Sequence, residues 1–196
     1  MKDIQDLWGL FNHFRYREAI KKGEQKLKTK PHDAEIMRLL GMSYDQLALK
    51  NQGEKKRIFQ KQAACYFKKI LKENPKSMAA YRGLGLVSLH QNKLDEALSY
   101  YQKVRRLNPQ DPNTFISVGN VYKAQKKIMF AKKWYAKAEK RKETKLVALV
   151  NETLLCQDLG DLIQAKKYAR KALVLIKRHK LPWMAVFEEK LRELAT

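Results

Sequence analysis

A period of 34 residues constrains this chain more than any other feature of its sequence. Alanines and large residues recur at that spacing, and Pro75 and Pro109 are also 34 residues apart. The alanines are Ala63, Ala97, Ala131 and Ala165, and the large residues are Tyr81, Phe115, Leu149 and Trp183. A fixed period of this length is typical of solenoids, in which each structural unit packs only on its neighbours.

The residue types within one period fit a pair of packed helices. Small residues such as Gly85 and Gly119 allow two helices to approach closely, and large residues such as Tyr101 and Tyr135 fill the layer between them. Apolar residues from Ile128 onward recur with the i, i+3, i+4, i+7 spacing of an amphipathic helix. The sequence therefore predicts an all-α chain of helical hairpins.

The order large residue, Leu-Gly, Ala-x3-aromatic and then Pro resembles the tetratricopeptide repeat. The clearest copy contains Tyr81, Leu84, Gly85, Ala97, Tyr101 and Pro109. The next copy contains Phe115, Val118, Gly119, Ala131 and Tyr135, with Glu143 where the proline would stand. The resemblance extends over essentially the whole chain. It implies a right-handed α-solenoid of helix-turn-helix repeats with a C-terminal capping helix.

Capping residues predict where the hairpins begin. Asp33, Ser77 and Asp111 can each cap the N-terminus of a first helix, and Pro112 suits the first helical position. Asn92 can cap a second helix. We expect a single solenoid over residues 1–196, with helix pairs at 1–31 (degenerate), 34–75, 78–109, 112–143 and 146–179, and a terminal helix at 182–195.

The terminal helix carries an apolar stripe of Trp183, Phe187 and Leu191. Packing of this stripe on the fifth pair is the favoured interpretation, because capping helices cover the end of a stack. Self-association through the stripe is the alternative.

The second pair is ten residues longer than the period allows, and the excess falls between Tyr44 and Ala63. Two longer helices with a protruding loop at Gly53 are the favoured interpretation. A loop that contacts a partner is the alternative.

Composition excludes several classes of protein. With 44% hydrophobic residues the chain can form a core, and its apolar runs are too short to span a bilayer. The first residues contain acids and lack the apolar core of a secretory signal. Cys65 and Cys156 lack the spacing of a disulfide framework, so we expect a cytoplasmic location.

No motif indicates catalysis, a cofactor or a metal site, so we expect a protein that is not an enzyme. The four histidines lie in different repeats and are predicted to be surface or loop residues: His13, His32, His90 and His179. Cys156 stands at a packing position and is predicted to be a buried structural thiol.

The family resemblance implies that the first helices line a concave groove. The candidate groove residues are Arg38, Met42, Arg82, Leu86, Leu89, Ile116, Asn120, Lys123, Val150, Asn151 and Leu154. Asn120 and Asn151 could hydrogen-bond a peptide backbone, and the leucines offer apolar contact. Some family members bind the C-terminal carboxylate of a chaperone tail with cations, but Ile116, Leu181 and Ala185 occupy those positions here. We therefore do not expect that activity.

The chain carries 42 Lys and Arg against 20 Asp and Glu, a net charge of +22. Most of this charge falls on the second helices and their loops, the convex face of such a stack. The outer-face residues are Lys132, Lys133, Lys137, Lys140, Arg141, Lys142, Lys166, Lys167, Arg170 and Lys171. The excess should attract nucleic acid, anionic lipid or an acidic protein surface. The alternative is a charged face that only contacts solvent.

Two functions from different classes follow. The leading hypothesis is a protein-interaction scaffold that binds a peptide or helical segment of a partner protein in its groove. The alternative is a basic helical-repeat protein that binds nucleic acid through its convex face. A third hypothesis is docking to an anionic membrane surface through the same lysines without insertion.

Overall fold

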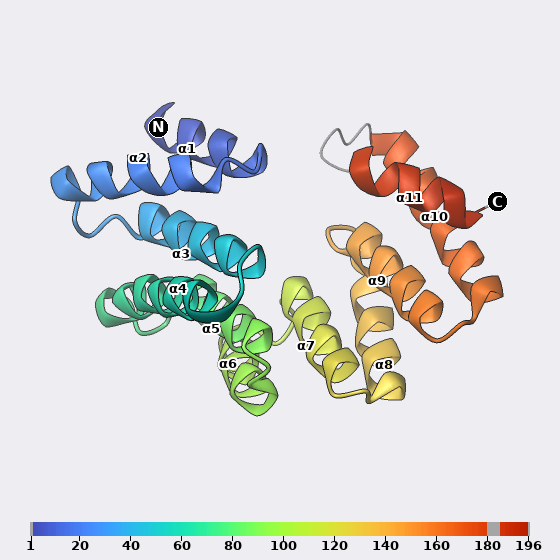
Figure 1. The fold of residues 1–196 in the computed structure, drawn as a ribbon. Helices are drawn as coiled ribbons and strands as arrows, with labels where there is room; N and C mark the ends of the chain where they lie inside the picture. The colour runs from blue at the N-terminus through green and yellow to red at the C-terminus, as the bar shows by residue number, and fades with distance from the viewer. Residues whose placement is uncertain (1, 180–184, 196) are drawn as a thin grey trace. The chain divides into compact units, whose positions relative to one another are not determined.

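The computed structural model describes residues 2–179 and 185–195, and α-helices are the only regular secondary structure among these residues (Figure 1). The helices are α1 (Lys2–Asn12), α2 (Tyr16–Thr29), α3 (Ala34–Leu49), α4 (Gly53–Glu73), α5 (Met78–His90), α6 (Leu94–Leu107), α7 (Pro112–Ala124), α8 (Ile128–Glu139), α9 (Lys145–Asp158), α10 (Leu162–His179) and α11 (Ala185–Ala195). The predicted all-α hairpin architecture is confirmed.

The helices group into two compact units, residues 1–109 and residues 110–196. In the first unit α1 pairs with α2, α3 with α4 and α5 with α6, and the hairpins meet through α2 and α3 and through α4 and α5. In the second unit α7 pairs with α8 and α9 with α10, the hairpins meet through α8 and α9, and α11 packs on α10. The assignment of the whole chain to a single solenoid domain stays a prediction.

The predicted caps of the first helices are confirmed. The Asp33 carboxylate accepts hydrogen bonds from the backbone of Glu35 and Ile36, each at 3.0 Å. The Ser77 hydroxyl accepts from Ala80 N at 3.3 Å, and the Asp111 carboxylate accepts from Thr114 N at 2.9 Å. Pro112 occupies the first turn of α7.

The prediction that Asn92 caps the second helix α6 is wrong. Asn92 has a φ of +60° and lies in the turn that ends α5, where Lys93 N donates to Ser88 O at 2.8 Å. This is the Schellman arrangement, in which a left-handed residue lets the chain satisfy the last helical carbonyls. The same geometry recurs at Phe14, Lys126 and Gly160. It therefore connects the two helices within four of the five hairpins.

The ten extra residues of the second pair lie entirely within its helices. Helix α3 has 16 residues against 13 in α5, and α4 has 21 against 14 in α6. The connection between α3 and α4 is as short as that between α5 and α6. Two longer helices are therefore confirmed, and the predicted protruding loop at Gly53 is absent because Gly53 begins α4.

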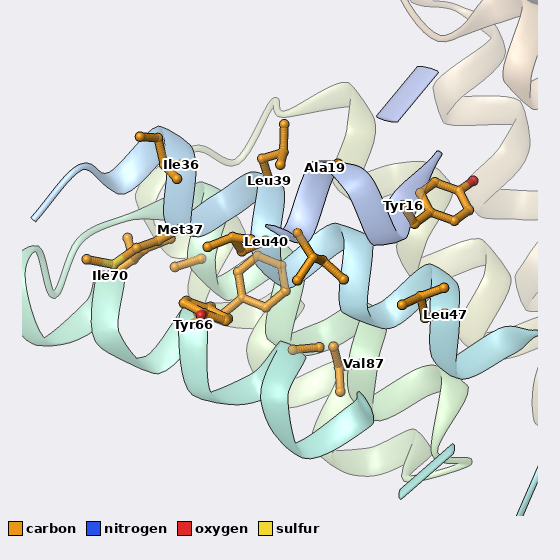
Figure 2. Close-up of a cluster of buried hydrophobic side chains, with 14 of the residues drawn as sticks. Tyr16, Ala19, Ile36, Met37, Leu39, Leu40, Leu47, Tyr66, Ile70 and Val87 are labelled. Atoms are coloured by element: carbon orange, nitrogen blue, oxygen red, sulfur yellow. The ribbon is translucent and has the colours of Figure 1, made fainter. Parts of the chain in front are cut away.

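The core of the first unit fills the space between α2, α3, α4 and α5 with aliphatic and aromatic side chains. Figure 2 shows Leu40 and Tyr66 from facing helices within this cluster, together with Val87 from the next hairpin. The four alanines that define the 34-residue period are completely buried. The positions that set the repeat are therefore the positions where the helices touch.

Aromatic rings pack directly over glycines of the facing helix. A Cβ on Gly85 would lie 2.6 Å from Tyr101 Cε1, and a Cβ on Gly119 would lie 2.5 Å from Tyr135 Cε1. The ring of Phe67 occupies the space over both Gly41 and Gly83, so it joins its own hairpin to the next. These rings leave no room for a methyl group.

The terminal helix α11 packs on the fifth pair, as the favoured interpretation predicts. The side chain of Leu191 is buried in a cluster with Leu149, Val150 and Ile176. Trp183 lies outside the described residues, and so does the side chain of Phe187.

We predict that Gly85→Ala lowers the free energy of unfolding by about 1–3 kcal/mol, because the added methyl group overpacks the contact with Tyr101. Gly9 is the matched control, because a Cβ there meets no atom within 4 Å. Gly9→Ala should leave stability unchanged or raise it by up to about 1 kcal/mol. Urea unfolding followed by circular dichroism measures both, and equal effects would contradict the close-packing argument.

Candidate functional site

In the first unit the first helices α1, α3 and α5 lie next to one another and present a mixed surface. The guanidinium group of Arg38 stacks over the ring of Trp8 at 4.5 Å from its centroid. Arg38 also donates to the Glu35 carboxylate at 3.0 and 2.5 Å, and Trp8 Nε1 donates to Glu35 Oε1 at 3.0 Å. The hydrogen bonds from Arg38 hold the pKa of Glu35 below its usual value. The cluster fixes Trp8 and Arg38 at the surface.

The other predicted groove residues of the first unit are half-buried on the same helices. Met42 lies one turn after Arg38 on α3, and Arg82, Leu86 and Leu89 lie on α5. Trp8 is not among the predicted groove residues, because the first helix of the degenerate pair does not match the repeat. The helical spacing of Ile4, Trp8 and Phe11 was the available signal.

In the second unit the predicted groove residues already have internal partners. Ile116 and Val150 are buried in the core. The side-chain oxygen Oδ1 of Asn120 accepts a hydrogen bond from the Tyr135 hydroxyl at 2.7 Å. Asn151 Nδ2 donates to the backbone carbonyl of Val147, on its own helix, at 2.8 Å.

Lys123 Nζ forms an ion pair with Asp158 at 2.7 Å, and Leu154 is half-buried against the core cluster that contains Val150. The second unit therefore offers fewer uncommitted groups on its first helices than the pattern predicts.

The predicted outer-face residues lie on α8, α10 and the connection after α8, and all except the half-buried Lys132 are exposed. Lys137 Nζ lies 4.3 Å from the centroid of the Trp134 ring, and Lys171 Nζ lies 3.6 Å from Glu139 Oε1. Arg141 donates to the Gln110 side chain. Trp134 itself packs against Phe115 with 5.8 Å between ring centroids.

A basic cleft of about 510 Å³ between α4, α5 and α6 was not predicted. Its floor includes Leu84 and Val87, and one wall carries Lys61, Lys68 and Lys72 from α4. Their spacing of seven and four residues places them on one helix face, a signal that the sequence contained.

His90 is not the surface histidine that the sequence predicts. Its Nδ1 atom lies 2.9 Å from both carboxylate oxygens of Asp45, whose side chain is only 1% exposed. Asp45 lies on α3 and His90 ends α5, so the pair joins the two hairpins. Gln60 lies in the lengthened part of α4, and its Nε2 atom donates a hydrogen bond to the backbone carbonyl of His90 at 3.4 Å.

A buried carboxylate replaces a core hydrophobic residue in the fifth pair. Glu152 is 4% exposed and stands one and two periods after Val118 and Leu84. Its Oε2 atom has no hydrogen-bond partner among the described residues. Burial, with a further contribution from the charge of Glu139, raises the pKa of Glu152 to about 7.

Cys156 is buried as predicted, and burial raises the pKa of its thiol. Within residues 2–179 and 185–195, no group of three or more His, Cys, Asp or Glu side chains could hold a metal ion. None of the described helices is both long and apolar enough to cross a bilayer. The cytoplasmic location stays a prediction.

Comparison with known proteins places this architecture among repeat proteins. A family model described as "Tetratricopeptide repeat" matches residues 61–112. No curated protein sequence matches the chain.

Two similar solved structures come from bacteria. TTC0263, a thermophilic TPR protein in Thermus thermophilus, is 20% identical with a TM-score of 0.78, over 97% of this chain and 94% of that one. MamA 41-end from Desulfovibrio magneticus RS-1 is 17% identical with a TM-score of 0.60, over 89% of this chain and 93% of that one. At these identities the likeness shows the fold.

We predict that His90→Ala lowers the free energy of unfolding by about 3 kcal/mol, because it leaves the buried Asp45 carboxylate without its partner. The double variant Asp45→Asn/His90→Ala should lose less than the sum of the two single variants. Urea unfolding of all three measures this coupling. Additive losses would mean that the two side chains do not stabilise each other.

We predict that Glu152 makes stability depend on pH. A carboxyl group whose pKa is higher in the folded state binds its proton more tightly there, so its contribution is favourable at low pH. The free energy of unfolding should therefore fall by up to roughly 3 kcal/mol as pH rises from about 4.5 through about 7, and then level off.

Glu152→Gln should remove this component of the pH dependence, and Glu152→Leu should raise the melting temperature most at pH 8. Thermal melts of both variants and the wild type at pH 5 and pH 8 provide the measurement. A wild-type profile that Glu152→Gln leaves unchanged would contradict the assignment.

Proposed function

Because the chain is a tetratricopeptide repeat protein, we propose that it is a non-enzymatic interaction scaffold that binds a peptide or helical segment of a partner protein on its first-helix surfaces. The observation that carries this proposal is the surface of α1, α3 and α5. Fixed aromatic and cationic groups there adjoin apolar side chains that are only half-buried.

The first unit offers the strongest part of this surface. Trp8 and Arg38 are held in place by Glu35, so a partner can contact them with little loss of side-chain entropy. Trp and Arg are the residue types that dominate binding energy at protein interfaces. Leu86 and Leu89 on α5 would receive an apolar side chain of the partner.

In the second unit Asn120, Asn151 and Leu154 are the residues we propose to contact a peptide. The Asn120 carbonyl is engaged by Tyr135, which orients its NH2 group. Rotation of Asn151 away from Val147 O would expose its amide to a peptide backbone. Ile116 and Val150 support this surface from the core.

Nucleic-acid binding through the outer lysines is the alternative function. The exposed cations on α8 and α10 favour it. The aromatic residues among them give it less support, because stacking on bases requires accessible rings. Tyr135 is completely buried, and Trp134 packs against Phe115 on one side while Lys137 covers it.

Binding measurements at two salt concentrations test the two functions. Peptides are selected on the wild-type chain from a random display library, and their affinity is measured by fluorescence anisotropy at 0.15 M and 0.5 M salt. Groove binding should survive the higher concentration, because apolar contacts are not screened, whereas phosphate contacts weaken steeply. A single-stranded oligonucleotide is measured in parallel.

Two variants locate the binding surface. Leu86→Asp/Leu89→Asp should weaken peptide binding at least tenfold, and Asn120→Ala/Asn151→Ala/Leu154→Ala should weaken it if the second unit takes part. Ile58→Asp is the matched control, because Ile58 is an exposed apolar residue on the second helix α4. Unchanged affinity in both groove variants, with oligonucleotide binding that Lys132→Glu/Lys133→Glu/Lys137→Glu abolishes, would replace the proposal by its alternative.

A further inference from the structure

Bulky apolar side chains are exposed at two neighbouring connections of the second unit, although the Phe130 ring also stacks on Tyr122 with 5.3 Å between centroids. Met129 and Phe130, in the first turn of α8, are 77% and 54% exposed. Leu162 and Ile163, in the first turn of α10, are 56% and 81% exposed. In Figure 1 the α7–α8 and α9–α10 connections lie on the same side of this unit, opposite the α8–α9 connection. We call these four residues the apolar edge.

The apolar edge is a departure from the rest of the chain, and it repeats. Met129 and Ile163 are one period apart, and the residue one period before Met129 is Asp95. Acidic residues stand in the first turns of α2, α4 and α6, but α8 and α10 have none. Acids there favour a helix through its dipole, so α8 and α10 replace favourable residues with exposed apolar ones. Exposed apolar clusters of this kind mark interaction sites.

Cations flank the apolar edge on both sides. The flanking lysines are Lys126, Lys127, Lys132, Lys133, Lys166 and Lys167, all exposed except the half-buried Lys132. Two acids lie nearby in the sequence. Asp158 forms an ion pair with Lys123 at 2.7 Å, and Asp161 keeps its charge while accepting a hydrogen bond from Gln164 N at 3.1 Å. The six lysines outnumber these acids, so the surface around the edge is positive.

We propose that the apolar edge and its flanking lysines dock the second unit on an anionic lipid bilayer. The four apolar side chains enter the boundary between headgroups and acyl chains, while the lysines remain at the level of the lipid phosphates. The lysines can do so because their long aliphatic stems keep the charge in water. The docking needs no helix that crosses the bilayer, and the first-helix surfaces proposed to bind a partner take no part in the contact.

A bilayer fits this surface better than other occupants. A second copy of the chain would bring the same positive charge to the contact and be repelled, since each chain carries +22. A nucleic acid would use the lysines but has no apolar layer to receive Met129 and Ile163. An anionic bilayer offers both an apolar layer for the four side chains and phosphate groups for the lysines.

Flotation with lipid vesicles tests the proposal. The full chain is mixed with vesicles of phosphatidylcholine alone, or with about 30% phosphatidylserine, at 0.1 M and 0.5 M salt. Binding should require phosphatidylserine and weaken at the higher salt, because the lysine attraction is screened. Absence of binding to the anionic vesicles at 0.1 M salt would overturn the proposal.

Two variants separate the apolar and the electrostatic contributions. Met129→Ser/Ile163→Ser should weaken vesicle binding about tenfold or more, whereas the control Ile58→Ser/Val174→Ser, at exposed positions outside the edge, should not. Lys126→Gln/Lys127→Gln/Lys133→Gln/Lys167→Gln should weaken binding about fivefold per lysine. Its control is Lys21→Gln/Lys22→Gln/Lys28→Gln/Lys68→Gln, on exposed lysines of the first unit.

A probe reports insertion directly. An environment-sensitive fluorophore on Met129→Cys, in a Cys65→Ser background, should shift to the blue with phosphatidylserine vesicles, and the same label on Ile58→Cys should not. Vesicle binding that Met129→Ser/Ile163→Ser leaves unchanged, or that an oligonucleotide displaces without any blue shift at position 129, would identify simple polyanion binding and overturn the proposal. Circular dichroism confirms that each variant is folded.

Discussion

The contact between an aromatic ring and a glycine of the facing helix is the interaction on which the rest of the structure depends. Tyr101 packs over Gly85 and Tyr135 over Gly119, each within one hairpin, and Phe67 extends the contact to the next hairpin through Gly83. Each ring sets how closely two helices approach, because the interior is packed to a density that leaves no space for a methyl group. The spacing of the surface side chains follows from that distance.

The positions at which the chain departs from this repeat are the positions that distinguish it. In the fifth pair Glu152 and Thr153 replace the Leu-Gly of the third, and the carboxylate is buried without a partner for one oxygen. In the second pair the longer α4 extends past the end of α5, where Gln60 meets the carbonyl of His90. In α8 and α10 exposed apolar residues occupy first turns that carry acids in the second helices α2, α4 and α6. In the fifth pair Thr153 and Ala169 stand where the third pair has Gly85 and Tyr101, so this pair packs without a ring-on-glycine contact. The changes in α4, α8 and α10 leave the contacts at Gly41, Gly83, Gly85 and Gly119 in place.

Sequence reasoning located the helices well because their signals are local. The caps Asp33, Ser77 and Asp111 depend only on residues two or three positions away, and all have the predicted place. The alanines were found from the 34-residue period instead, and they are buried. The prediction for Asn92 was wrong because asparagine is favoured both as a helix N-cap and at a left-handed turn position, and only the backbone conformation distinguishes the two. Trp8 was missed because the first pair lacks the repeat's own pattern, although its apolar spacing was visible.

The amino-acid sequence by itself determined that this chain is a stack of helical hairpins, because small and large residues recur every 34 residues and so place the same packing contacts in successive pairs. It also determined the large positive charge and its concentration on the second helices. Only the tertiary structure decided which polar groups are committed. In the folded chain Asp45 pairs with His90, 45 residues away, and Asn120 accepts a hydrogen bond from Tyr135. Glu152 is buried with one oxygen that has no hydrogen-bond partner among the described residues. These outcomes depend on which helix faces meet, and contacts between hairpins are set by three-dimensional packing rather than by any local pattern.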